Sequence, residues 1–488
     1  MPAAEPRRKV RRSPMSRVDT AWLRMERATN LMMITGVMMF ESPLDIRTLR
    51  KVIETKFLAY PRFRQKAVDT PTGAFWQDDA DFDLDWHIHL TALPGRSGKK
   101  ELERLTSQLA STPLDKTKPL WQFHLVEKFD GGSALISRIH HCYADGIALV
   151  QVLLSLTEIG VDDRRKEALA KRWLKKEEHA PVAKRVGAID RYMELGGKLV
   201  EKGLDFYRDP ALAAVLASEG VDIAREVGLA LALSDDPDTV LKGRLGVSKR
   251  VAWADPLPLD EVKSVSRALR CTVNDLLLAS ASGALRSYML ERGECLDGVT
   301  IRATVPVNLR PLEHAKQLGN HFGLVFLDLP VGEANPMRRL ERIAASMRVL
   351  RKSRQAVATF GALAAVGMAP PAVQQFALEL FSRKASAVAT NVPGPQMPLY
   401  LGGSRIRDLM FWVPQTGSIG LGISILSYDG AVHFGLMSDA RLMPDPGGVI
   451  SRFRPEFEKL LYLALMARWE GAFCAEDAEA LLVGAESA

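Results

Sequence analysis

The chain has 488 residues, of which 47% are hydrophobic and 25% are charged, and its formal net charge is +7. A chain of this length is expected to fold into two or more domains, and this composition is typical of globular rather than disordered proteins. The four cysteines are scattered without a CxxC pair, which argues against a zinc cluster or a disulfide framework.

Residues 1–15 form a basic leader in which Arg7, Arg8, Lys9, Arg11 and Arg12 face a single acidic residue. We expect this leader to be disordered and solvated. The alternative is attraction to anionic lipid, which contributes about 1 kcal/mol for each basic residue held near the surface. Nucleic acid is not expected as a partner, because no recognised nucleic-acid motif follows the leader.

Residues 16–160 mix strand and helix patterns and are predicted to form an N-terminal domain. The apolar run 31–40 predicts a buried strand, and residues 44–60 have the spacing of an amphipathic helix. Two apolar runs, 121–129 and 133–141, flank Asp130-Gly131-Gly132, which is a hairpin signal. Residues 147–159 then have the length and spacing of a helix.

Residues 161–247 are predicted to form a linker that is charged at first and helical later. Its apolar stretch 210–233 either packs on the protein's own surface or lies on a membrane. Residues 248–488 are predicted to form a second domain, in which helix and strand patterns are again mixed. Helices are expected at 259–270, 272–292 and 447–467, and strands at 300–310, 321–331 and 418–439.

The chain contains neither a secretory signal nor a run of about 18 apolar residues, so we expect no membrane span. The common catalytic signatures GxSxG, HExxH, the Walker loop and a complete GxGxxG are also missing. His87 and His89 have no obvious third ligand, so we expect packed side chains there and no metal site. This leaves the stretch HHCYADG, residues 140–146, as the candidate site.

A histidine can accept a proton near neutral pH, because its ordinary pKa is about 6.5. His141 comes where a strand becomes a loop, Asp145 is placed to cap the helix that begins near Ile147, and Gly146 permits close packing of the backbone. The competing interpretation is a buried histidine pair beside a capped turn. No Ser or Cys is placed as a nucleophile, so a lone base suits direct attack by a substrate hydroxyl or amine on an activated acyl group.

The spacing HHxxxDG resembles the signature of the CoA-dependent acyltransferase superfamily, which includes chloramphenicol acetyltransferase and the condensation domains of peptide synthetases. Further stretches resemble the bacterial wax ester synthase/diacylglycerol acyltransferase family in the family's own order. They are SRVDTAWLRMERATNLMMITGVMMF (16–40), PLDKTKPLWQFHLVE (113–127), TVNDLLLASASGALRSYM (272–289), VPVNLRP (305–311) and TNVPGPQMPLY (390–400). The resemblance covers the chain from about Ser16 to Met443.

This resemblance implies an α/β fold of two chloramphenicol-acetyltransferase-like sheet-and-helix domains joined by a helical linker, with the active channel between them. It implies that His141 is the general base and that His140 supports it. Asp145 would pair with Arg310 and clamp the loop, and Gly146 completes the motif. The channel itself is not visible in the sequence.

Two other motifs are expected to support the site. Asn274, followed by Asp275, could donate to the acyl carbonyl or oxyanion, or it could cap a helix. Pro119, Leu120 and Trp121 are expected to pack beneath the channel.

The resemblance predicts an O-acyltransferase that moves a long-chain acyl group from acyl-CoA to diacylglycerol, to a fatty alcohol, or to both. Acyl-CoA would be a co-substrate, and no bound cofactor is expected. The alternatives are another alcohol or amine as acceptor, or a non-catalytic lipid-binding or lipid-droplet protein. We expect a cytoplasmic location with peripheral attachment to the inner face of the membrane or to lipid inclusions, because the substrates are apolar.

Overall fold

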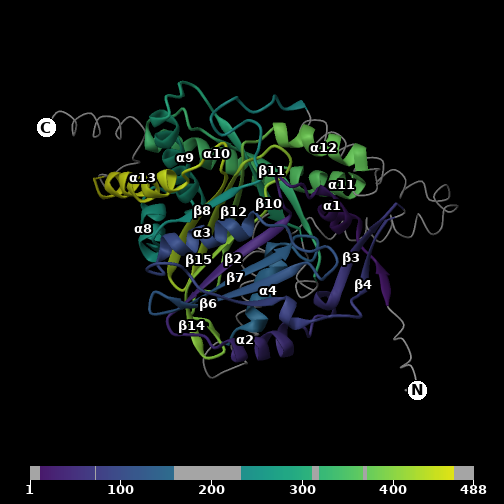
Figure 1. The fold of residues 1–488 in the computed structure, drawn as a ribbon. Coiled ribbons are helices and arrows are strands. Elements are labelled where there is room, and N and C mark those ends of the chain that lie inside the picture. The colour runs from purple at the N-terminus through teal and green to yellow at the C-terminus, as the bar shows by residue number, and fades with distance from the viewer. Residues whose placement is uncertain (1–10, 72, 159–231, 310–317, 367–370, 467–488) are drawn as a thin grey trace, which may run out of the picture.

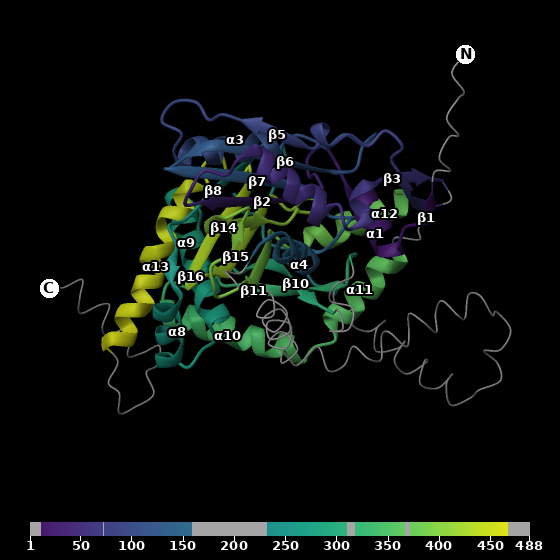
Figure 2. The same ribbon diagram turned by 90° about the horizontal axis from the view of Figure 1, so that it is seen from below.

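Strands from both predicted domains build two large sheets that lie side by side, with helices around them (Figures 1 and 2). The structure is a computed structural model, and it describes residues 11–71, 73–158, 232–309, 318–366 and 371–466. The mixed α/β architecture predicted from the sequence is confirmed.

The first large sheet has the strand order β13-β14-β2-β7-β6-β5. Its strands are β2 (Met33–Phe40), β5 (Ile88–Thr91), β6 (Trp121–Phe129), β7 (Gly132–His140), β13 (Tyr400–Leu401) and β14 (Ser404–Trp412). The predicted hairpin joins β6 to β7, and positive φ angles at Asp130 (48°) and Gly131 (79°) give the tight turn that right-twisted strands require. His140 is the last residue of β7, so the candidate motif begins where this strand ends.

The second large sheet has the order β11-β10-β12-β15-β16-β8, and the short strand β9 also pairs with β16. Its strands are β8 (Lys249–Trp253), β9 (Leu257–Pro258), β10 (Ile301–Asn308), β11 (Phe322–Leu329), β12 (Ala387–Pro393), β15 (Leu421–Tyr428) and β16 (Ala431–Asp439). Strands β10 and β12 are parallel and pair only at Ala303–Ala387 and Thr304–Val388. Beyond these two pairs, the edge of β12 that faces β10 is open.

The helices pack on the faces and ends of the sheets. They are α1 (Arg17–Met25), α2 (Ile46–Val52), α3 (Lys99–Ala110), α4 (Gly146–Leu156), α8 (Leu259–Ala268), α9 (Val273–Glu291), α10 (Pro336–Lys352), α11 (Gln355–Val366), α12 (Pro371–Arg383) and α13 (Gly447–Met466). A π-helical turn, Ile53–Phe57, extends α2. Buried side chains occur along nearly the whole of α9, which explains its lack of an amphipathic pattern. No helix in the described part of the chain is long and apolar enough to cross a membrane.

One exchange of strands joins the two halves of the molecule. Strand β14 follows β12 and β13 in the chain, yet it pairs with β2 of the first sheet, with Trp412 opposite Thr35 and Met410 opposite Val37. The segment 400–412 therefore belongs spatially to the N-terminal sheet, which the sequence did not predict. The predicted boundaries at residues 160 and 248 stay a prediction.

Part of the predicted leader forms a strand. Arg12–Pro14 forms strand β1, which pairs with β4 (Gly73–Asp78), and β4 pairs in turn with β3 (Gln65–Thr70). The expectation of disorder throughout 1–15 is wrong for these residues, where the Arg12 guanidinium also lies 4.2 Å from the centre of the Phe75 ring. Residues 1–10 and most of the predicted linker, including residues 210–231 of its apolar stretch, lie outside the described residues.

Candidate active site

His141 occupies the first position after β7 and is fixed on several sides. Its backbone N–H donates to the Met32 carbonyl at 2.7 Å. The Trp22 ring from α1 stacks on the imidazole with centroids 4.1 Å apart, and Phe322 from β11 lies at 5.6 Å. Both halves of the molecule therefore hold this ring.

Burial governs the charge of His141, since its side chain is almost fully enclosed. Burial lowers the pKa of His141 to about 4, although the neighbouring Asp145 carboxylate opposes the shift. The imidazole is thus neutral at pH 7, which is the state of a base. Nδ1 is buried without a hydrogen bond to the described residues, so we infer that Nε2 is the nitrogen that a substrate in the adjoining pocket can reach.

His140 is engaged elsewhere. Its Nδ1 accepts a hydrogen bond from the Cys142 backbone N–H at 3.1 Å, and its Nε2 lies 3.2 Å from a carboxylate oxygen of Glu26. Burial raises the pKa of Glu26, but His140 and Lys116 outweigh it and bring that pKa down to about 2. His140 therefore faces a carboxylate from the end of α1, while His141 lines a pocket; the supporting role of His140 stays a prediction.

Asp145 connects the motif to the second sheet. Its Oδ1 accepts from the Ala148 backbone N–H at 2.8 Å, which confirms the predicted cap of α4. Its Oδ2 accepts from the His321 N–H at 2.9 Å, next to the start of β11. The expected partner, Arg310, lies in the segment 310–317 outside the described residues, so that ion pair stays a prediction.

Sequence reasoning missed two residues, Asn320 and Asp19, that fix the backbone of the motif at His141 through hydrogen bonds. The Asn320 side-chain amide donates both to the His141 carbonyl oxygen and to Asp19 Oδ1, each at 2.8 Å. Burial raises the pKa of Asp19 to about 6, although hydrogen bonds from Asn320 oppose this. Asp19 precedes Trp22 by one turn of α1, so α1 contacts the ring of His141 directly through Trp22 and its backbone only indirectly, through Asn320.

No local pattern marks these two residues. Two weak signals were present: Asn320 follows a glycine just before a predicted strand, and Asp19 lies in the stretch 16–40. Gly319 itself is needed for close approach: it has a φ of 117°, donates to the Tyr143 carbonyl at 3.1 Å and accepts from the Asp145 N–H at 3.3 Å.

Asn274 proves not to be the helix cap. Thr272 and Asp275 form a capping box at the start of α9, in which each side chain accepts from the other residue's backbone N–H. The Asn274 Oδ1 instead accepts a hydrogen bond from the Asn391 side-chain N–H at 2.6 Å. Asn391 lines a pocket with His141, so the Asn-Asp motif reaches this pocket through another residue.

Pro119 and Leu120 precede β6, Trp121 is its first residue, and all three are buried, as expected for a packing motif. The Trp121 side chain is fully buried and its indole N–H donates to the Phe63 carbonyl at 2.8 Å. Its ring meets Phe57 edge-on at 4.8 Å, and it stacks on His87 at 4.1 Å. Since Phe57 lines an apolar pocket, Trp121 supports that pocket from beneath.

Two adjoining pockets meet at the motif. The pocket that contains His141 encloses about 840 Å³ of empty space, including its opening to solvent, and is also lined by Trp22, Asp145 and Asn391. The second, of about 720 Å³, is lined almost entirely by apolar side chains from β2, β7, α4 and β14. Gly146 and Phe411 line both. An added Cβ at Gly146 would meet no other atom within 4 Å, so this shared wall position faces open space.

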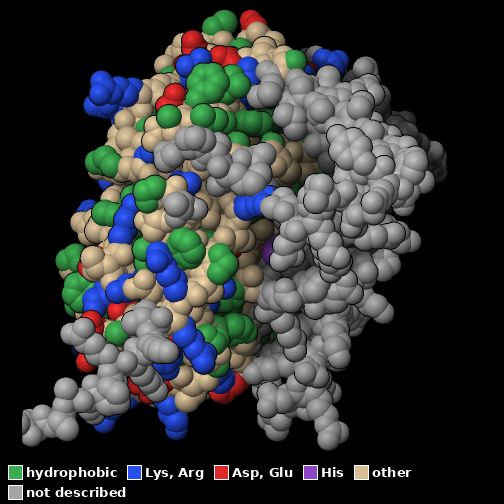
Figure 3. All heavy atoms as spheres, turned by 90° about the vertical axis from the view of Figure 1, so that its right-hand side faces the viewer, with side chains coloured by type: hydrophobic (Ala, Val, Ile, Leu, Met, Phe, Trp, Pro, Cys, Tyr) green, Lys and Arg blue, Asp and Glu red, His purple; other side chains and the backbone are tan. Residues whose placement is uncertain are grey.

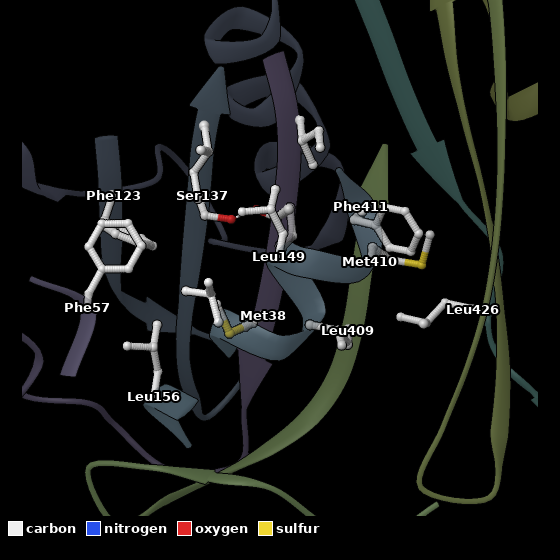
Figure 4. A pocket seen from close by; sticks show the side chains of 16 residues that line it. Met38, Phe57, Phe123, Ser137, Leu149, Leu156, Leu409, Met410, Phe411 and Leu426 are labelled. Carbon is white, nitrogen blue, oxygen red and sulfur yellow. Dashed lines mark hydrogen bonds between the residues drawn. The ribbon is translucent and has the colours of Figure 1, made fainter. Parts of the chain in front are cut away.

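Figure 4 shows the apolar pocket from close by. Phe57 and Phe123 lie together at one side, near Leu156 on α4, while Phe411 and Leu426 lie at the opposite side. We refer to the two cavities below as the His141 pocket and the apolar pocket. The lining of the second is suited to hydrocarbon, and the first places polar side chains beside a neutral base.

The chain matches known family models over most of its length. A model described as the wax ester synthase/diacylglycerol acyltransferase catalytic domain matches residues 15–277, and one described as the WS/DGAT C-terminal domain matches residues 318–461. A Mycobacterium tuberculosis protein named "Probable diacyglycerol O-acyltransferase tgs2" is 30% identical over 446 residues, covering 87% of this chain and 94% of that protein. Another from the same organism, tgs1, is 30% identical over 381 residues, covering 76% and 78%.

Solved structures resemble the fold. The wax ester synthase/diacylglycerol acyltransferase from Marinobacter aquaeolei VT8 superposes with a TM-score of 0.64 at 20% identity, covering 93% of this chain and all of that one. The first condensation domain of the calcium-dependent antibiotic synthetase gives a TM-score of 0.56 at 16% identity, covering 96% and 99%. At these identities the likeness establishes the two-domain condensation-type fold.

Proposed function

Because this chain belongs to the wax ester synthase/diacylglycerol acyltransferase family and is therefore an O-acyltransferase, we propose that it moves a long-chain acyl group from acyl-CoA to diacylglycerol, a fatty alcohol, or both, with His141 as the general base. The observation that carries the proposal is the placement of a neutral, buried imidazole in the wall of a pocket that adjoins an apolar pocket. A hydrocarbon chain and a reacting carbonyl need this combination.

The reaction needs no protein nucleophile. His141 takes the proton from the acceptor hydroxyl as its oxygen attacks the thioester carbonyl carbon. The tetrahedral intermediate then collapses, the carbon–sulfur bond breaks, and the departing thiolate receives the proton from His141. A positioned proton transfer of this kind contributes typically about 10²–10⁴-fold in rate. Acyl-CoA is the co-substrate in this scheme, and no resident cofactor takes part.

The two pockets suggest a division of the substrates. The apolar pocket, closed on one side by Phe57 and Phe123, suits the acyl chain. The His141 pocket carries Thr304, Thr390 and Asn391 beside its apolar residues, and it suits the thioester and the acceptor hydroxyl. The family relatives named diacylglycerol O-acyltransferases favour diacylglycerol as the acceptor.

The test is an acceptor panel with purified protein and palmitoyl-CoA. Free CoA should be released only when an acceptor is added, and chromatography of the lipid product should show triacylglycerol, wax ester or both. Release of CoA without any ester product would contradict the proposal, and acceptor-independent lipid binding without CoA release would favour a lipid-binding protein instead.

We also propose that the protein attaches peripherally to the cytoplasmic face of the membrane or to lipid inclusions. The apolar substrates favour this. Figure 3 shows Lys and Arg side chains spread over the face at the right of Figure 1, with hydrophobic side chains gathered toward its upper end, where α12 lies. On α12, Phe376 is 69% exposed and Val373 52%. Basic and exposed apolar side chains together suit an anionic lipid surface.

A further inference from the structure

The wall of the His141 pocket formed by β10 and β12 holds polar side chains, and most of their donors are already used. The Thr304 hydroxyl donates to the Ala387 carbonyl at 3.4 Å, and the Thr390 hydroxyl donates to the Ile423 carbonyl at 3.2 Å. Asn391 follows Thr390 on the edge of β12 that β10 leaves open. Its half-buried side chain lines the same pocket as His141.

The Asn391 side-chain amide is held in place by one hydrogen bond, and one of its two N–H groups remains able to donate. A side-chain amide carries two N–H donors, and one of them donates to Asn274 Oδ1 at 2.6 Å. Among the described residues, the second N–H of Asn391 makes no hydrogen bond. Asn274 is itself fixed in the first turn of α9, between Thr272 and Asp275 of the capping box. A donor that is fixed before the substrate arrives is the kind that stabilises developing charge most effectively.

We propose that Asn391 donates this second N–H to the carbonyl oxygen of the acyl thioester, and that Asn274 is the positioning residue that holds the Asn391 amide. This inference rests on the proposed function. When the acceptor oxygen attacks the carbonyl carbon, the carbonyl π electrons move to oxygen, and Asn391 stabilises the resulting negative charge. When the carbonyl re-forms, the carbon–sulfur electrons leave with the CoA sulfur, which takes the proton held by His141. The products are the ester and free CoA.

The assignment differs from an expectation based on the Asn-Asp motif alone. In that motif, Asn274 would meet the substrate itself. In the structure, the Asn274 side chain meets Asn391 and the sulfur of Met347, at 3.9 Å from its Nδ2. The residue that reaches the pocket comes from the TNVPGP stretch, more than a hundred positions later in the chain.

The test compares variants of the full-length protein with palmitoyl-CoA and a long-chain alcohol. Asn391→Ala should lower kcat by about 10²–10³-fold, the usual effect of losing one oxyanion donor, with the KM for palmitoyl-CoA changed only a few-fold. Asn274→Leu removes the oxygen that holds the amide and should cost about tenfold in kcat. Asn274→Asp keeps an oxygen at this position and should recover most of that loss. The Asn391→Ala and Asn274→Leu changes together should cost no more than Asn391→Ala alone.

Several results would overturn the inference. A wild-type kcat in Asn391→Ala would do so. Equal activity in Asn274→Leu and Asn274→Asp would also do so, and this second comparison remains decisive even where Asn391→Ala fails to fold. A larger kcat loss in Thr416→Val than in Asn391→Ala would assign the donor to Thr416, which lines the same pocket. Wild-type protein and His141→Ala run beside them: an inactive wild type contradicts the proposed function, whereas an active wild type with an unaffected Asn391→Ala contradicts only this inference.

Discussion

Replacing Asp145 by alanine should destabilise the protein as well as slow it. The change removes the Oδ1 cap on the Ala148 N–H and the Oδ2 acceptor of the His321 N–H. Loss of a helix cap costs about 0.5–2 kcal/mol, and a buried N–H left without a partner costs about 1–3 kcal/mol. We therefore expect a loss of about 1.5–5 kcal/mol in the free energy of unfolding. Asp145→Asn keeps one acceptor oxygen and should lose roughly half as much.

The assay is urea unfolding followed by circular dichroism, together with acyl transfer measured well below the melting temperature. Because the Asp145 carboxylate raises the pKa of His141, Asp145→Asn should also move the acid limb of the kcat/KM profile to lower pH. The reasoning fails if Asp145→Ala unfolds within about 0.5 kcal/mol of the wild type, a value typical of surface substitutions, while activity is abolished. That combination would mean that Asp145 acts on the substrate and not through the loop.

Between pH 6.5 and 4, His141 takes up a proton in the unfolded state but not in the folded state, so protonation should cost about 3 kcal/mol of stability as the pH falls. Asp19 opposes this, because with a pKa of about 6 it is protonated in the folded state before the unfolded state and offsets part of the loss. Urea unfolding of Asp19→Asn should therefore show a steeper loss of stability in acid than the wild type, and an identical pH dependence would contradict the burial argument. Asn320→Leu should lower kcat and leave KM nearly unchanged, because it removes the hydrogen bond that holds the His141 carbonyl. A change in KM alone would argue against a role of Asn320 in positioning His141. Leu156→Trp should fill the apolar pocket near Phe57 and shift preference from palmitoyl-CoA to octanoyl-CoA, whereas an unchanged chain-length profile would place the acyl chain elsewhere. Deleting residues 1–10 should weaken the salt-sensitive part of the binding to anionic vesicles, since salt screens surface charges within about 10 Å at 0.1 M. Acyl transfer to a short-chain alcohol should stay intact, and vesicle binding that changes with neither salt nor the deletion would exclude the leader as the membrane contact.

Much of the fold follows from local patterns. The β6–β7 hairpin could be predicted because Asp130 and Gly131 supply the two positive φ angles of its turn. The helix after the motif could be predicted because Asp145 is a good capping residue. Such signals depend on neighbours in the chain, and they survive without knowledge of the tertiary structure.

The features that escaped prediction depend on contacts between distant segments. Nothing near Ser404–Trp412 indicates that this strand leaves its own half to pair with β2. Likewise, Asn320 meets His141 across 179 positions of sequence, and Asn391 meets Asn274 across 117. The short strand at Arg12–Pro14 was missed for a related reason, since its basic composition favours solvent while its partner strand β4 lies over sixty residues away.

The central claim is that His141, and not its neighbour, moves the proton in acyl transfer. The most direct measurement is the rate of CoA release from palmitoyl-CoA with a long-chain acceptor, in purified His141→Ala and His140→Ala proteins whose folding is verified by circular dichroism. We predict that His141→Ala loses nearly all transfer, whereas His140→Ala, which loses a contact with Glu26, retains more. Equal loss in two equally stable variants would contradict a single base, and full activity in His141→Ala would refute the account.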